Sequence, residues 1–164
     1  MKNINLFVLL FTLLLTTSLF SQSEQVNIPF QDATAAKQLK IDIPMGEIRI
    51  KGTNRKDILV RYETSEEEEE QQDETSVEKN KGLKKIAGSN LNLEMTCSEN
   101  VATIRASNWY RYLILDIEVP QNIALDIQKN IGDTVWVSNI SGNVNIEINV
   151  GDIIAEGIKG LVNA

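Results

Sequence analysis

The residues best suited to contact a ligand form one aromatic cluster late in the chain. Trp109, Tyr110 and Tyr112 stand close together, with Arg111 among them. Flat aromatic rings beside a guanidinium group can stack on sugar rings. Trp136 joins this candidate surface patch, because it is exposed if the valines on either side of it point inward. Structural packing remains an alternative, since one face of a strand over the cluster would belong to the core.

Pairs of carboxylates offer a second kind of chemistry. Hydrolysis of a glycosidic bond requires two carboxyl groups facing each other across a sugar, about 5 to 10 Å apart. Stacked strands could align Asp116 with Glu118, or Asp126 with Glu147. Such pairs also arise by chance in any acidic β protein. A polysaccharide-active enzyme on a β-helix scaffold is therefore an alternative, and we assign no catalytic residue.

The composition excludes several classes of site. The chain has no histidine and a single cysteine, Cys97, so Ser-His-Asp and Cys-His catalysis are excluded. Cys97 lies on the apolar phase of an alternating run, and we expect a buried thiol without a disulfide. Glu47, Asp133 and Asp152 each follow a glycine, as in calcium-binding β-rolls, but the tight register of those repeats is absent. We predict no metal and no cofactor.

The first 21 residues are organised like a secretory signal. Lys2 precedes an apolar run over residues 6–15 and a polar stretch that ends at Ser21. The run is shorter than the ~20 residues that span a bilayer. We expect cleavage after Ser21 and export to the periplasm, the cell surface or the medium, with no membrane span in the mature chain.

The acidity of the chain is concentrated in one segment. Loss of Lys2 leaves 15 basic and 23 acidic residues, a balance that argues against nucleic acid as a partner. Residues 63–88 contain five consecutive glutamates, at 66–70, followed by several lysines. Adjacent carboxylates repel one another and cannot be buried together. This segment is predicted to be a solvated insertion loop.

The rest of the mature chain alternates apolar and polar residues with period two, which predicts half-buried strands and an all-β fold. No stretch of comparable length has a helical period. The expected strands cover residues 39–43, 48–50, 58–62, 91–95, 101–105, 113–119 and 123–127.

The last third of the chain adds a repeat. Asn130-Ile131-Gly132-Asp133 aligns with Asn149-Val150-Gly151-Asp152 at an offset of 19, and later segments align at an offset of 18. A fixed period of this length predicts a solenoid, in which each turn of chain stacks on the previous one. An ordinary β-sandwich with regularly spaced turns is the alternative.

These features together resemble a known family. Ile-Pro-Met-Gly-Glu-Ile-Arg-Ile-Lys-Gly at 43–52, Leu-Asp-Ile-Glu-Val-Pro-Gln-Asn at 115–122 and the Gly-Asp corners are similar to adhesin-like β-solenoid domains of secreted bacterial proteins of the Bacteroidetes type. The resemblance implies export and a short-coil β-solenoid with one charged insertion loop. It brings no catalytic residues.

The predicted organisation is a signal peptide at 1–21, a lead-in at 22–38 and a β-solenoid at 39–164 with its insertion at about 63–88. We expect an exported, non-enzymatic, adhesin-like binding or structural protein of the surface or envelope. Its expected partner is an extracellular polymer or an envelope protein, and an accessory role through a partner encoded nearby is a further alternative. The repeats stop at Ala164 within a coil, so we also expect either end-to-end self-association through the last coil or a chain shorter than its relatives.

Overall fold

The computed structural model of the chain describes residues 24–32, 34–64, 93–107 and 111–164. Within these residues the chain forms eleven strands and no helix, so it also has no helix that could cross a lipid bilayer. The all-β prediction is confirmed. The predicted signal peptide and most of the predicted insertion lie outside the described residues.

The six strands between residues 38 and 131 fall close to the positions that the alternation predicts. The strand at Glu24–Ile28 lies in the predicted lead-in, and the last four strands lie in the repeat, for which no strand bounds were predicted. Their bounds are β1 Glu24–Ile28, β2 Gln38–Thr53, β3 Ile58–Thr64, β4 Leu93–Ser98, β5 Val101–Ala106, β6 Leu113–Pro120, β7 Ala124–Ile131, β8 Val135–Ser138, β9 Val144–Ile148, β10 Ile153–Glu156 and β11 Val162–Asn163.

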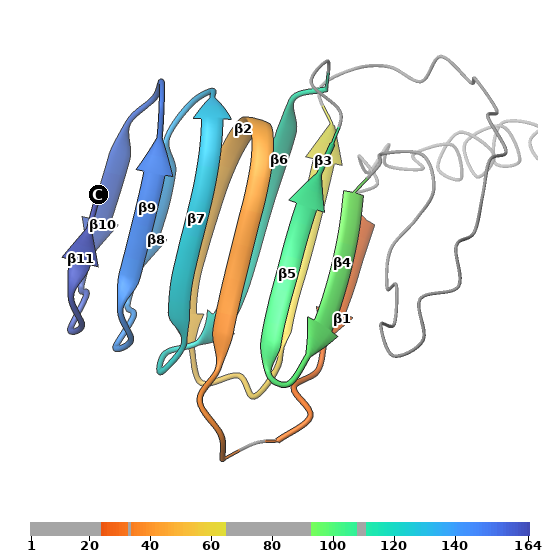
Figure 1. Ribbon diagram of the computed structural model, residues 1–164, viewed down its shortest axis with the longest axis vertical. Helices are drawn as coiled ribbons and strands as arrows, with labels where there is room; N and C mark the ends of the chain where they lie inside the picture. Colours follow the sequence, from red (N-terminus) through yellow and green to blue (C-terminus); the bar gives the residue numbers. More distant parts are fainter. Residues whose placement is uncertain (1–23, 33, 65–92, 108–110) are drawn as a thin grey trace, which may run out of the picture.

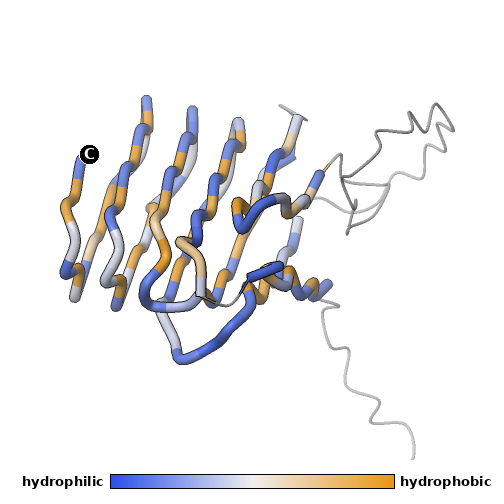
Figure 2. The backbone as a smooth tube through the Cα atoms, turned by 60° about the horizontal axis from the view of Figure 1, so that its bottom comes forward, coloured by the Kyte–Doolittle hydropathy of each residue, from blue (hydrophilic) through white to orange (hydrophobic). Residues whose placement is uncertain are grey.

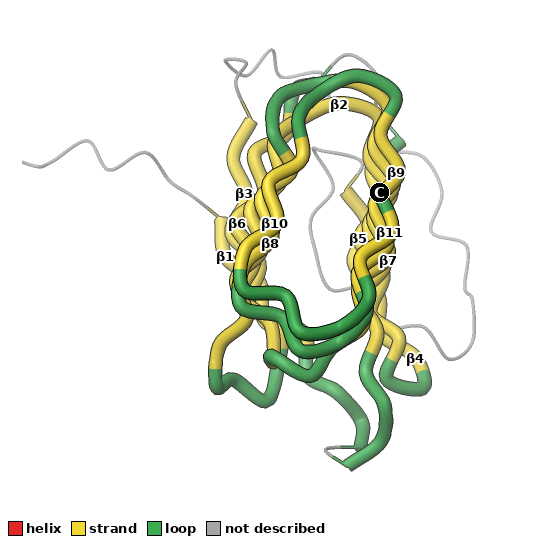
Figure 3. The backbone as a smooth tube through the Cα atoms, turned by 90° about the vertical axis from the view of Figure 1, so that its left-hand side faces the viewer, coloured by secondary structure: helices red, strands yellow, loops and turns green. Residues whose placement is uncertain are grey.

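Two sheets face each other, and one strand belongs to both (Figures 1 and 3). Sheet A has the order β1-β3-β6-β2-β8-β10, and sheet B has the order β4-β5-β2-β7-β9-β11. The first half of β2 lies in sheet B and its second half lies in sheet A. The central strand therefore fixes how the two sheets are placed relative to each other.

The two short strands predicted at 39–43 and 48–50 are one continuous strand, and that prediction was wrong in its division. Ile43 pairs with Lys129 in sheet B, while Gly46 pairs with Leu113 in sheet A. Gly46 has a φ of +152°, which lets the chain turn between the sheets without losing its hydrogen-bonded neighbours. Figure 3 shows β2 passing over one end of the oval formed by the two sheets.

Parallel pairing relates residues that are 18 or 19 positions apart. Asp126 on β7 pairs with Asn145 on β9, and Asn145 pairs in turn with Asn163 on β11. In sheet A, β8 and β10 pair in parallel in the same way. From β7 onward the chain thus alternates between the sheets, and each pass stacks on the one before. The opposite end of the sheets is built from antiparallel pairs, namely β1 with β3, β3 with β6, and β4 with β5.

The core lies between the sheets and consists of stacked aliphatic side chains. Ile41, Ile127 and Ile146 occupy one register position on three neighbouring strands, and none is more than 3% exposed. The alternation of apolar and polar residues runs along every long strand (Figure 2). Cys97 packs against this core but is half-buried, so the thiol is less enclosed than predicted, although burial raises its pKa.

Glycines stack at the turn between the sheets because the backbones approach too closely for a side chain. A Cβ at Gly132 would lie 2.4 Å from the carbonyl oxygen and 2.8 Å from the amide nitrogen of Gly46, closer than real Cβ atoms come to other heavy atoms. Gly132 also has a φ of +135°, a conformation that other residues rarely take. The glycine spacing seen in the sequence therefore reflects close packing of backbone on backbone.

Replacing Gly132 should consequently destabilise the fold. For Gly132→Ala we expect a loss of roughly 2–4 kcal/mol in the free energy of unfolding, because overpacking costs about 1–3 kcal/mol and the left-handed φ adds about 1 kcal/mol. Urea denaturation measures the change. Ser141→Ala, at an exposed position, is the control and should stay within about 0.5 kcal/mol of the parent. Equal denaturation midpoints for all three proteins would contradict this account.

Candidate functional site

Trp136 lies on the outer face of sheet A, as the alternation around it predicts. Its side chain is 42% exposed, whereas Val135 and Val137 are 0% and 1% exposed. The two valines hold β8 against the core, and the pleat turns the indole outward. A large aromatic ring is thereby fixed on a rigid strand with much of its surface open to solvent.

The neighbours of Trp136 are set by strand register. Arg49 on β2 pairs with Trp136 on one side, and Ile154 on β10 pairs with it on the other. Asp116 on β6 extends the line beyond Arg49. We call these four residues the Trp136 row. Because adjacent strands are about 4.8 Å apart, the row places charged, aromatic and aliphatic groups side by side.

Arg49 is held beside the indole by two carboxylates. Its guanidinium contacts Glu47 at 2.7 Å and Asp116 at 3.6 Å. The hydrogen bond to Glu47 is the main cause that raises the pKa of Arg49. The Arg49 side chain is 50% exposed, so these pairs add little to stability. They orient a guanidinium and two carboxylates where a ligand stacked on Trp136 can hydrogen-bond to them.

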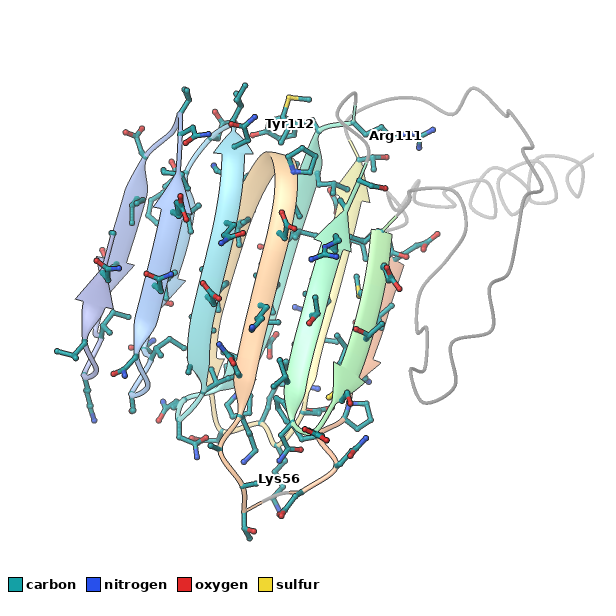
Figure 4. All side chains as sticks on the ribbon, viewed as in Figure 1. Lys56, Arg111 and Tyr112 are labelled. Atoms are coloured by element: carbon teal, nitrogen blue, oxygen red, sulfur yellow. The ribbon has the colours of Figure 1, made fainter. Side chains whose placement is uncertain are left out.

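The predicted aromatic cluster is only partly within the described residues. Trp109 and Tyr110 lie outside them, whereas Arg111 and Tyr112 are half-buried at the turn that leads into β6. Figure 4 shows both of these side chains at the same end of the sheets. The Tyr112 hydroxyl donates to the carboxylate of Asp133. The structure therefore links Tyr112 to the loop that leads into β8 and Trp136.

Sequence reasoning missed Arg49, Glu47 and Asp116 as neighbours of Trp136. The alternation between Ile48 and Ile50 already places Arg49 on an outward phase. Which strand lies beside β8 depends on the pairing of residues far apart in the chain, and no local pattern gives that register. The row is thus a product of tertiary structure.

Three of the four carboxylates considered for hydrolysis have other partners. Glu118 contacts Arg61 at 2.9 Å and Arg55 at 3.9 Å, and Asp116 contacts Arg49. Asp126 accepts a hydrogen bond of 3.0 Å from Asn145. Glu147 pairs in register with Gln128 and not with Asp126. The two members of each pair therefore do not occupy paired register positions.

The acidic residues that follow the corner glycines surround a buried lysine. The side chain of Lys129 points between the sheets, and the residue is 4% exposed. Its Nζ donates to the carbonyl oxygen of Gly46 at 3.2 Å and to that of Asp133. Desolvation lowers the pKa of Lys129, opposed by Asp133, Glu47 and Asp152 in that order. The described residues contain no cluster of three or more His, Cys, Asp or Glu that could hold a metal ion.

The comparisons with known proteins give one distant structural likeness. No protein-family model matches the chain, and no curated protein matches it. The chain is similar to the crystal structure of a "putative cell adhesion protein" from Clostridium sporogenes ATCC 15579, with a TM-score of 0.38 and 10% identity. The alignment covers 87% of this chain and 98% of that one.

The Tyr112–Asp133 contact predicts an alkaline signature. Burial and the hydrogen bond to Asp133 raise the pKa of Tyr112 from 10.0 to about 12. The folded chain therefore keeps a proton that the unfolded chain loses above pH 10, so this stabilisation is complete below pH 10 and is lost as the pH rises through about 12. In Tyr112→Phe, ultraviolet titration should lose one late-ionising phenol, and the free energy of unfolding should fall less steeply over this range.

Tyr62 provides the control for that titration. Its pKa is also raised to about 12, mainly by burial and then by its hydrogen bond to Glu24. Tyr62→Phe should remove a similar late-ionising phenol while leaving that of Tyr112 in place. A Tyr112→Phe titration curve identical to that of the parent protein between pH 10 and 12 would refute the assignment.

Proposed function

We propose that this protein is an exported, non-enzymatic β-solenoid that presents an adhesin-like binding surface to an extracellular polymer or an envelope protein. The solenoid is supported by the parallel register, in which residues 18 or 19 apart pair on successive passes. Export is supported by the pattern of residues 1–21. We propose that the exported protein resides in the periplasm, on the cell surface or in the medium.

The Trp136 row is the observation that carries the binding role. The indole is 42% exposed, and the residues on either side of it, Val135 and Val137, are buried. The strand is therefore already ordered, and a ligand that stacks on the indole costs little conformational entropy. Arg49 supplies donors on one side and Ile154 supplies an apolar surface on the other. Exposed aromatic rings with adjacent hydrogen-bonding groups are typical of binding surfaces.

A binding role fits these residues better than hydrolysis. A general acid needs a carboxyl group that is free to give up a proton to the substrate. On sheet A, Asp116 and Glu118 are engaged by arginines, and on sheet B Asp126 is engaged by Asn145. These contacts hold the carboxylates as ion-pair and hydrogen-bond partners.

Replacing the indole tests the proposal. Trp136→Ala should weaken binding to envelope fractions at least tenfold, because the stacking surface is lost, and should leave the urea midpoint nearly unchanged. Val150→Ala is the control, since Val150 is 59% exposed but lies outside the row. Detection of hydrolysis products in a screen of immobilised glycans, or unchanged binding of envelope fractions by Trp136→Ala, would overturn the proposal.

We also propose that the chain associates with a second copy through β10 and β11. In the described part of the chain each of these strands pairs on one side only, with β8 and β9 respectively. Leu161 and Val162 are 78% and 48% exposed beside that edge. Exposed strand edges with apolar side chains favour pairing with another chain.

Sedimentation at increasing protein concentration checks this association. The parent protein should shift towards a dimer, and Leu161→Asp should remain monomeric, because it places a charge at the proposed interface. Lys159→Ala is a control at an exposed position close to the same edge and should behave like the parent. A parent protein that stays monomeric at every concentration would refute self-association.

A further inference from the structure

The outer face of sheet B contains a groove that the Trp136 row does not use. The groove is open and has a volume of about 580 Å³, and it lies across β5, β2, β7 and β9 near the turn between the sheets. Its polar lining includes Asp42, Arg105, Gln128, Asn130, Glu147 and Asn149, together with Ser107 and the buried Lys129. We call it the sheet B groove.

Register arranges the floor of the groove as a line of hydrogen-bonding groups. Arg105 pairs with Asp42, Asp42 with Gln128, and Gln128 with Glu147. These four side chains leave the sheet on the same face, at the strand spacing of about 4.8 Å. A linear polymer laid along this line meets a new polar side chain at every strand that it crosses.

Part of this lining is already paired, and part is open to a ligand. Arg105 contacts Asp42 at 3.2 Å, and both side chains are more than half exposed. Within the described part of the chain, Gln128 and Glu147 are both exposed and make no hydrogen bond or ion pair with another side chain. Their amide and carboxylate groups are free to bind hydroxyl groups in a bidentate manner.

At the end of the groove near the turn between the sheets, an amide pair lies beside apolar residues. The Asn149 amide donates to the side-chain oxygen of Asn130 at 2.6 Å, which fixes both side chains. Pro44 and Ala106 line the groove as well, but both are buried, so the apolar surface that they add is small. Hydrogen-bonding groups beside small apolar surfaces match a sugar ring, which has hydroxyl groups around its edge and C–H groups on its faces.

The position on a sheet face favours a sugar chain over a peptide. The backbone groups of β2 and β7 are consumed by pairing with neighbouring strands, so the face offers side chains alone. A peptide would leave its own backbone donors and acceptors without the ladder that a strand edge supplies. A hydroxyl group both donates and accepts, so it can satisfy an amide, a carboxylate or a guanidinium.

We propose that the sheet B groove binds a linear polysaccharide whose units carry hydroxyl groups and no acidic group. Of the charged groups that line the groove, Arg105 contacts Asp42, and the Nζ of Lys129 donates to the carbonyl oxygens of Gly46 and Asp133. The charge left open to a ligand is the carboxylate of Glu147, so polyuronic acids are repelled. This binding site is independent of the Trp136 row, on the opposite sheet, and adds a ligand class that the proposed function leaves open.

Titration of the isotopically labelled full chain, followed by NMR of side-chain amides, tests the groove. The probes are cellohexaose, xylohexaose, chitohexaose and a chitosan hexamer as non-acidic glycans, with hexagalacturonate and oligolysine as contrasts. We expect saturable shifts of the Gln128 and Asn149 amide signals with at least one non-acidic glycan. Affinity for hexagalacturonate should be at least tenfold weaker.

Variants separate this groove from the Trp136 row. The double variant Gln128→Ala, Glu147→Ala should bind the non-acidic glycan that shifts the amide signals at least tenfold more weakly than the parent protein. Trp136→Ala should bind the same glycan with unchanged affinity. Asn163→Ala is the matched control, because Asn163 is an exposed amide residue on the outermost strand of sheet B, outside the groove.

Several results would overturn the proposal. They are a lack of shifts with every non-acidic glycan, tightest binding of hexagalacturonate, binding of oligolysine alone, and unchanged glycan affinity in the double variant. If Trp136→Ala abolishes glycan binding while the double variant retains it, the groove proposal fails and the proposed function stands.

Discussion

The structure depends on one strand that belongs to two sheets. β2 pairs with β5 and β7 in sheet B and with β6 and β8 in sheet A, and it turns between them at Gly46. Each flanking strand takes its register from β2, so an error of one residue there would move aliphatic side chains to the surface in both sheets. The absence of a side chain at Gly46 and Gly132 allows the successive passes to stack at this turn.

The same turn explains a buried charge inside an otherwise aliphatic core. Lys129 occupies an inner register position that is isoleucine in β2 and β9, at Ile43 and Ile148. Corner carbonyls that point inward need donors, and a buried ammonium supplies them. The carboxylates of Glu47, Asp133 and Asp152 nearby offset part of its desolvation cost.

The two outer faces differ in chemistry although they share one construction. Sheet A presents arginine–carboxylate pairs around Trp136, and sheet B presents amides such as Asn130, Asn145 and Asn149 that hydrogen-bond across strands. In both sheets the pleat points alternate side chains outward, and the parallel register aligns these side chains on neighbouring strands. Both faces therefore fit a ligand that extends over several strands.

The sequence by itself determined where most strands between residues 38 and 131 lie, because period-two alternation is a local property. It also identified the outward position of Trp136 and the corner glycines. The sequence pattern predicted two strands where β2 is one. Local composition cannot distinguish the end of a strand from a bend at which the strand stays hydrogen-bonded to adjacent strands. Only the tertiary structure decided that Arg49 lies beside Trp136, that Gln128 lies between Asp42 and Glu147, and that Lys129 points inward. These contacts join residues distant in the chain, and their register depends on the packing of the whole stack.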